Sequence, residues 1–261
     1  MIKLLALDMD GTLLDDENKI PESTVAAIKQ SAEAGIKVIL ASARPVCAMM
    51  PYYKQLCLDP TPIIALCGAY ILDVKNTKKL FECSLSDEIC QKIYELFEGR
   101  YIKIYGKSTL YVNEIKAETL RYAENFQVDY HKIEINRNTK IPEKIYRIFI
   151  PGLSNSETEE SLKLINAGAD QVASKLEHGI EILPPHINKG MAVEFLCKQY
   201  GIAREHVMAI GNEGSDISMV EFAQIGVAVA NAHTDLKNVA NEITAANTQL
   251  GVELMIKKYC L

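Results

Sequence analysis

The 261-residue sequence has no tryptophan, no excess of basic residues and no long uninterrupted hydrophobic segment. Its net charge of −6 argues against binding to a nucleic-acid backbone, because nucleic-acid-binding domains usually carry a basic surface. No apolar run approaches the roughly 20 residues of a transmembrane helix, so we expect no association with a membrane. The opening MIKLLAL is too short for a signal-peptide core and is followed by Asp8. We therefore expect a cytoplasmic protein.

Cysteine is present but lacks the spacing of disulfide frameworks and of zinc sites. The seven cysteines form an odd set with no Cys-x-x-Cys pair, a pattern that is typical of reduced thiols in the cytosol. A complete nucleotide-binding loop is also missing. The Gly-Lys-Ser at 106–108 has Tyr101 where that motif requires glycine, so we interpret it as a hairpin turn.

An α/β pattern is present at both ends of the chain. In residues 1–72 short apolar runs alternate with amphipathic stretches, and the same alternation returns after residue 186. Short apolar runs separated by helices are typical of strands buried on both faces of a parallel sheet. We predict that 1–80 and 186–261 together form one α/β domain with a Rossmann-like, doubly wound parallel sheet.

The middle of the chain predicts a unit of another kind. Residues 101–113 have the pattern of a β-hairpin, and further strands are expected at 144–150, 170–177 and 179–184. Helices are expected at 86–98 and 154–167, the second of which begins with a capping box. We predict that 81–185 is an α+β domain inserted into the α/β domain.

Two aspartates follow the first predicted strand, in LALDMDGTLL. Asp8 and Asp10 are two residues apart, so the period of a strand would direct both carboxylates to one side. Two such charges about 4 Å apart repel by about 4 kcal/mol at an effective dielectric constant of about 20. Either a cation binds between them or one carboxyl stays protonated.

Polar residues also follow later predicted strands. Ser42, Ala43 and Arg44 provide a hydroxyl, a backbone N–H and a guanidinium near a helix start, which suit a phosphate group. Lys189 lies in the first turn of a predicted helix, where a cation is unfavourable unless an anion offsets it. The alternative for Arg44 and for Lys189 is an ordinary solvated side chain.

Together these residues resemble the motifs of a known family. The motifs are Asp8-x-Asp10-Gly11-Thr12, Ser42-Ala43-Arg44-Pro45, Lys189-Gly190 and Gly211-x-x-x-x-Asp216. In this order they are similar to the four motifs of haloacid-dehalogenase-type phosphatases. The large insert resembles the cap domain of the Cof-like branch, which includes sugar-phosphate phosphatases. The resemblance extends over nearly the whole chain.

The resemblance implies a Mg²⁺-dependent phosphomonoester hydrolase whose partner is a small phosphorylated metabolite. It implies that Asp8 is the nucleophile that forms an aspartyl-phosphate, and that Asp10 acts as acid and base. Lys189 would assist catalysis and contact the phosphoryl group. The further implied substrate-binding residues are Thr12, Ser42, Ala43, Arg44 and Ser215, and the implied metal ligands are Asp8, Asp10, Asn212 and Asp216.

Four positions depart from the family pattern. Asn212 stands where a metal-binding aspartate is usual, Ser215 where an amide is usual, Ala43 where glycine is usual, and Cys67 where asparagine is common. An uncharged Asn oxygen predicts weaker Mg²⁺ binding, since ligand charge tunes affinity for such ions. An alternative is therefore a protein that binds a phosphorylated ligand and turns it over poorly. A sugar phosphomutase is a further alternative.

Overall fold

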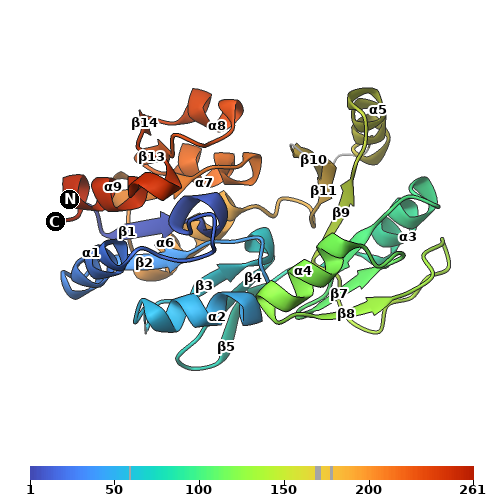
Figure 1. The fold of residues 1–261 in the computed structure, drawn as a ribbon, viewed down its shortest axis with the longest axis horizontal. Helices are drawn as coiled ribbons and strands as arrows, with labels where there is room; N and C mark the ends of the chain where they lie inside the picture. The colour runs from blue at the N-terminus through green and yellow to red at the C-terminus, as the bar shows by residue number, and fades with distance from the viewer. Residues whose placement is uncertain (59, 168–171, 177–178) are drawn as a thin grey trace. The chain divides into compact units, whose positions relative to one another are not determined.

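The computed structural model describes residues 1–58, 60–167, 172–176 and 179–261. They form two compact units (Figure 1). The first unit comprises Met1–Arg44, Met49–Phe81 and Asn188–Leu261, and the second comprises Pro45–Ala48 and Glu82–Ile187.

A five-stranded parallel sheet is the centre of the first unit. Its order is β14-β13-β12-β1-β2, and each neighbouring pair is parallel. Every residue of the two central strands is buried, so both faces of the sheet are covered, as predicted for this end of the chain. The strands are β1 (Leu4–Leu7), β2 (Lys37–Leu40), β12 (Val207–Gly211), β13 (Ile225–Ala228) and β14 (Glu242–Ile243).

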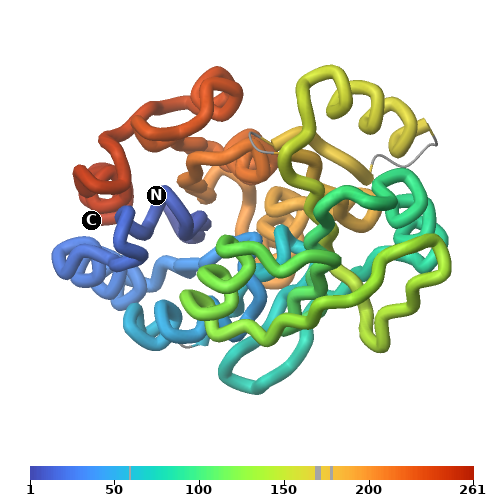
Figure 2. The backbone as a smooth tube through the Cα atoms, turned by 45° about the vertical axis from the view of Figure 1, so that its right-hand side comes forward, coloured from blue at the N-terminus to red at the C-terminus, as the bar shows by residue number. Residues whose placement is uncertain are grey.

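Helices cover this sheet in packed pairs. α1 contacts α9, and α6 contacts α7. Pro21 immediately precedes α1 and Gly35 follows shortly after its end, which are the places where these two residue types are favoured beside a helix. Figure 2 shows that the two chain ends lie close together in this unit. The helices are α1 (Glu22–Glu33), α6 (Lys189–Tyr200), α7 (Ile217–Phe222), α8 (Thr234–Val239) and α9 (Gly251–Tyr259), while α2 (Val46–Gln55) has residues in both units.

The apolar run at 62–66 departs from the alternation within 1–72, which predicts a strand of the parallel sheet there. β3 (Ile63–Ala65) pairs antiparallel with β4 (Tyr70–Asp73) in a separate sheet of order β3-β4-β5, and a single bridge joins Ile64 in parallel to Ala41. The reason is a sharp reversal at 66–68, where three consecutive residues have positive φ. Residues 74–77 form the turn between β4 and β5 (Lys78–Glu82), which are neighbours in this sheet.

The second unit is built on a six-stranded sheet of order β10-β11-β9-β6-β7-β8, in which only β7 and β8 are paired in parallel. The predicted hairpin at 101–113 and the capping box between Ser154 and Glu157 are confirmed. The strands are β6 (Lys103–Tyr105), β7 (Thr109–Val112), β8 (Asp129–Lys132), β9 (Arg147–Pro151), β10 (Ala173–Leu176) and β11 (Gly179–Ile182). The helices are α3 (Asp87–Leu96), α4 (Ala117–Phe126) and α5 (Asn155–Ile165).

Within the described ranges, no helix combines the length and the apolar character needed to cross a membrane.

Gly68 brings the reversal after β3 against the start of α6. Its φ is +100°, and a Cβ added there would lie 2.4 Å from the carbonyl oxygen of Asn188, directly before Lys189. We expect Gly68→Ala to lower the free energy of unfolding by about 2 to 4 kcal/mol, from backbone strain and overpacking together. Urea denaturation measures this loss.

Gly201→Ala is the matched control in the same unit. Gly201 also has a positive φ of +62°, but no atom of the described residues lies within 4 Å of an added Cβ. Its replacement should therefore cost only the strain of a left-handed residue, about 1 kcal/mol. Equal losses in the two variants would show that the contact with Asn188 is unimportant.

Candidate active site

The two central strands bring the first and fourth sequence motifs to one edge of the sheet. β1 and β12 are parallel neighbours with Leu7 opposite Ile210, so Asp8 and Asn212 follow at the same edge. The chain moves from β1 to β2 on one side and from β12 to β13 on the other. In doubly wound sheets, ligands bind at the point where the strand order changes direction in this way.

The strand ends at Leu7, and Asp8 and Asp10 lie in the turn that follows it. Asp8 is 5% exposed, whereas half of the Asp10 side-chain surface is exposed. Gly11 has a φ of +72°, and a Cβ at this position would lie 2.6 Å from the Asn212 amide. Glycine therefore lets the two loops approach each other, and the two carboxyl groups come to lie in different environments.

A buried ammonium group joins Asp8 to the fourth motif. Lys189 Nζ lies 2.7 Å from Asp8 Oδ1 and 2.6 Å from Asp216 Oδ1, and Lys189 is 2% exposed. Burial and the Asp216 charge raise the pKa of Asp8 to about 7, although Lys189 opposes this shift. Burial alone would lower the pKa of Lys189, but the two carboxylates outweigh it and raise that pKa. When ionised, the three groups carry one excess negative charge.

Asp216 also shapes the loop that follows β12. Its Oδ2 accepts hydrogen bonds from the backbone N–H groups of Asn212 and Glu213, both at 2.9 Å, and the residue is fully buried. Both carboxylate oxygens of Asp216 thus have protein donors. Ser215 lies half-buried in the same loop, and no hydrogen bond joins it to the acidic residues within the described part of the chain.

Arg44 is the partner of Asp10. Its Nε and Nη2 donate to the two Asp10 carboxylate oxygens at 2.8 and 2.5 Å, and Nη2 also donates to Asn18 Oδ1 at 3.1 Å. Arg44 is 2% exposed, and its guanidinium carbon lies 5.2 Å from the centre of the Tyr52 ring. The Ser42 hydroxyl accepts a hydrogen bond from the Arg44 N–H, and Ala43 lies half-buried between them. Both carboxylate oxygens of Asp10 are therefore hydrogen-bonded to one buried guanidinium.

The side-chain amide of Asn212 lies at the centre of an oxygen cluster. One of its two terminal atoms is 2.9 Å from Thr12 Oγ1, 2.9 Å from the Asp10 carbonyl oxygen and 3.0 Å from Asp8 Oδ2. Because the carbonyl and the carboxylate can only accept, these partners assign the amide nitrogen to this place. With the amide turned over, the Thr12 hydroxyl can instead donate to Asn212 Oδ1.

The same cluster has the donor type and the spacing for a hard divalent cation. Oxygens on adjacent vertices of a Mg²⁺ octahedron with bonds of about 2.1 Å are about 3.0 Å apart. That is the spacing of the Asn212 amide atom from Asp8 Oδ2 and from the Asp10 carbonyl oxygen. Among the described residues, however, no group of three His, Cys, Asp or Glu side chains has the arrangement of a metal site. Asp8 is thus the single charged ligand of this set.

Several contacting residues were not predicted from the sequence. Asn231 donates to the Gly11 carbonyl oxygen at 2.8 Å, and Asn18 and Tyr52 contact Arg44. Asn231 follows the apolar run of β13, so the rule that polar residues at strand ends meet at one edge could have found it. Asn18 and Tyr52 carry no comparable sequence signal.

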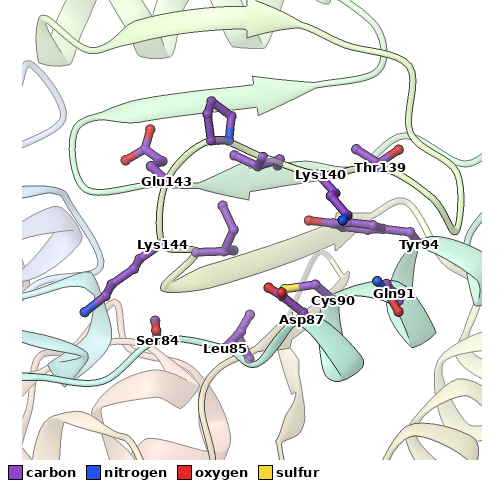
Figure 3. Close-up of a pocket in the computed structure, with 13 residues that line it drawn as sticks. Ser84, Leu85, Asp87, Cys90, Gln91, Tyr94, Thr139, Lys140, Glu143 and Lys144 are labelled. Atoms are coloured by element: carbon purple, nitrogen blue, oxygen red, sulfur yellow. The ribbon is translucent and has the colours of Figure 1, made fainter.

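The second unit contains a separate cavity of about 520 Å³ (Figure 3). Two of its charged lining residues form hydrogen bonds with other side chains of the protein. The Lys144 ammonium donates to Glu82, and the Glu143 carboxylate accepts from the Tyr111 hydroxyl. In Figure 3 the Lys144 ammonium extends away from Cys90, whose pKa is raised to about 11 by burial. The cavity contains none of the residues that the sequence predicts for phosphate chemistry.

Comparison with known proteins identifies the family. Residues 5–256 match the family described as haloacid dehalogenase-like hydrolase. The chain belongs to the haloacid dehalogenase-like hydrolases. It is 28% identical to 5-amino-6-(5-phospho-D-ribitylamino)uracil phosphatase YitU of Bacillus subtilis (strain 168), over 98% of this chain and 97% of that protein. The family predicted from the motifs is therefore confirmed, and so is the prediction of a phosphatase.

Solved structures agree with this assignment. A haloacid dehalogenase-like hydrolase from B. subtilis is 25% identical and has a TM-score of 0.86, covering 98% of this chain and 99% of that chain. The HAD subclass IIB sugar phosphatase BT4131 is 21% identical with a TM-score of 0.84, covering 98% of each chain, and shows the same fold. The predicted fold class of this haloacid dehalogenase-like hydrolase is confirmed.

The excess negative charge around Lys189 predicts how two variants change stability. We expect Asp8→Asn to raise the free energy of unfolding near pH 8 by about 1 to 3 kcal/mol, because a neutral set of groups is cheaper to bury. Lys189→Met should lower it by about 3 to 5 kcal/mol, because two buried carboxylates lose their cation. Urea denaturation in EDTA measures both effects.

The pH dependence has a definite sign. The pKa of Asp8 is about 7 in the folded protein against an ordinary 3.8, so the folded state binds more protons between these values. Protonation of Asp8 therefore stabilises the folded state; this contribution to the free energy of unfolding is complete below about pH 4 and is lost as the pH rises through about 7. The advantage of Asp8→Asn should therefore grow from about pH 5 to about pH 8. If Asp8→Asn were less stable than wild type at about pH 8, the inference that Asp8, Asp216 and Lys189 carry a destabilising excess negative charge would be wrong.

Proposed function

We propose that this phosphatase hydrolyses phosphomonoesters of small metabolites, sugar phosphates among them, through an aspartyl-phosphate on Asp8. The observation that supports this most directly is the buried Asp8 carboxylate. It lies where the strand order of the sheet changes direction, and its Oδ1 is 2.7 Å from Lys189 Nζ. A carboxylate held at a ligand-binding edge beside a fixed cation is suited to attack an anionic phosphoryl group.

In the first step, an Asp8 carboxylate oxygen forms a bond to phosphorus as the bond from phosphorus to the ester oxygen breaks. The leaving oxygen takes a proton from the Asp10 carboxyl. In the second step, a water oxygen attacks the phosphorus, Asp10 takes a proton from that water, and the bond from phosphorus to Asp8 breaks. Inorganic phosphate leaves and both carboxyl groups return to their starting states.

The surrounding residues bind and orient. Lys189 fixes Asp8 and offsets phosphoryl charge, while Arg44 positions Asp10 through two hydrogen bonds. We assign the phosphoryl oxygens to Thr12, Ser42, the Ala43 N–H and Ser215, and direct contact of Arg44 with phosphate stays a prediction.

Mg²⁺ would be held by the Asp8 carboxylate, the Asp10 carbonyl oxygen and the Asn212 side-chain oxygen. When bound, the ion supplies positive charge that offsets the charge of the phosphoryl group. In this proposal Asp216 orients Lys189 and the loop, since its two oxygens already accept hydrogen bonds inside the protein.

A second candidate is a protein that binds a phosphorylated ligand and turns it over poorly. Two observations favour it. Asn212 supplies an amide where a carboxylate is usual in the family, and Asp10 is held by Arg44 at both carboxylate oxygens. An acid that must exchange an ion pair for a leaving group is hindered in proton transfer.

Phosphate release from p-nitrophenyl phosphate and from a panel of sugar phosphates, with and without Mg²⁺, tests the proposed reaction. The panel should include a ribitol phosphate, because the name of the relative YitU specifies a phosphoribityl substrate. We expect Asp8→Asn to reduce release at least about a thousandfold, since it removes the nucleophile.

Asp235→Asn serves as the control, because this carboxylate is 71% exposed. It should leave release unchanged. If wild type and Asp8→Asn are equally inactive while the sugar phosphates raise the melting temperature, the binding protein is the better description.

A further inference from the structure

Asn212 places one terminal atom of its amide at the position of a third ligand, beside the two protein oxygens that a cation would share. Its amide nitrogen has two hydrogens and three acceptors within reach: Asp8 Oδ2, the Asp10 carbonyl oxygen and Thr12 Oγ1, at 3.0, 2.9 and 2.9 Å. Asp8 Oδ1 already accepts from Lys189. Both oxygens of the proposed nucleophile therefore have a donor without any ion.

A donor at this position has a clear physical reason. The Asp8 carboxylate and the Asp10 carbonyl oxygen lie next to the same amide atom, and both are hydrogen-bond acceptors. Asp8, Lys189 and Asp216, when ionised, already carry one excess negative charge. A carboxylate at 212 would add another negative charge, which only a cation could offset. An amide instead offers two N–H groups, which satisfy buried acceptors that would be costly to leave unpaired.

The surroundings hold the Asn212 backbone in place. Its N–H donates to Asp216 Oδ2 at 2.9 Å, and its carbonyl oxygen accepts from the His233 N–H at 2.8 Å. The other end of the amide lies against Gly11, which has no Cβ to push it away. Asn212 is 8% exposed, and rotation of its amide would exchange the oxygen and the nitrogen without moving the backbone.

We propose that the Asn212 amide substitutes for the divalent cation in the free protein. The amide nitrogen donates hydrogen bonds to both Asp8 Oδ2 and the Asp10 carbonyl oxygen. A cation can coordinate these two oxygens only after the amide rotates and its hydrogen bonds break. The site is then ordered without metal, and Mg²⁺ binds weakly. This inference rests on contacts of the free protein and not on the proposed reaction.

Thermal denaturation of wild type and Asn212→Asp, in EDTA and in MgCl₂, tests the proposal without any turnover. The wild-type melting temperature should change by less than about 1 °C on adding Mg²⁺. Asn212→Asp should melt at least about 3 °C lower than wild type in EDTA and regain that loss with Mg²⁺. Calorimetric titration should give Asn212→Asp at least about tenfold tighter Mg²⁺ binding, because it adds a charged ligand.

Asn138→Asp is the matched control, since it adds the same charge at an exposed position of the second unit. It should respond to Mg²⁺ as wild type does. A wild-type melting temperature that rises with Mg²⁺ as much as that of Asn212→Asp would overturn the proposal, and so would equal stability of the two proteins in EDTA. If Asn212→Asp does not fold, the Mg²⁺ titration of the wild-type protein is sufficient. Saturable Mg²⁺ binding that raises the wild-type melting temperature would contradict the proposal that the Asn212 amide substitutes for the cation. Failure of the phosphatase assay would leave these readouts unaffected.

Discussion

The ion pairs of the buried Lys189 ammonium are the interaction on which the candidate active site depends. The ammonium lies within 2.7 Å of Asp8 and of Asp216, and so joins the turn after β1, the start of α6 and the loop after β12. Removing two carboxylates from water without a cation would be costly. The ion pairs therefore hold together segments about 200 residues apart in the chain, as the Thr12 to Asn212 contact also does.

Each of the two motif aspartates has its own hydrogen-bonding partners and its own degree of burial. Asp8 is buried, accepts from Lys189 and Asn212, and has a raised pKa. Asp10 is half exposed and is held by Arg44. Two carboxyl groups in different environments are what a nucleophile and an acid/base residue require. In the proposed metal site, Asp8 Oδ2 and the Asp10 carbonyl oxygen have the neutral amide of Asn212 as their third member.

Local pattern predicted much of the fold because the relevant signals are short-range. The alternation of apolar runs and helices predicted the parallel sheet, and Ser154 with Glu157 predicted the start of α5. The errors have separate reasons. After β3 the chain reverses through residues with positive φ, so β3 pairs with the strand that follows it. β8 was missed because all four of its residues are exposed and lack apolar alternation, and α4 was not predicted.

By itself, the sequence determined the family, the parallel sheet and the identity of the residues at the strand ends, because motif spacing and hydrophobic period are local properties of a chain. Only the tertiary structure decided which of those residues touch. It paired Arg44 with Asp10, engaged both oxygens of Asp216 internally, and turned the Asn212 amide towards Asp8 and Asp10. Hydrogen-bond partners and burial depend on atoms brought together from distant segments, and no spacing rule along the chain specifies them.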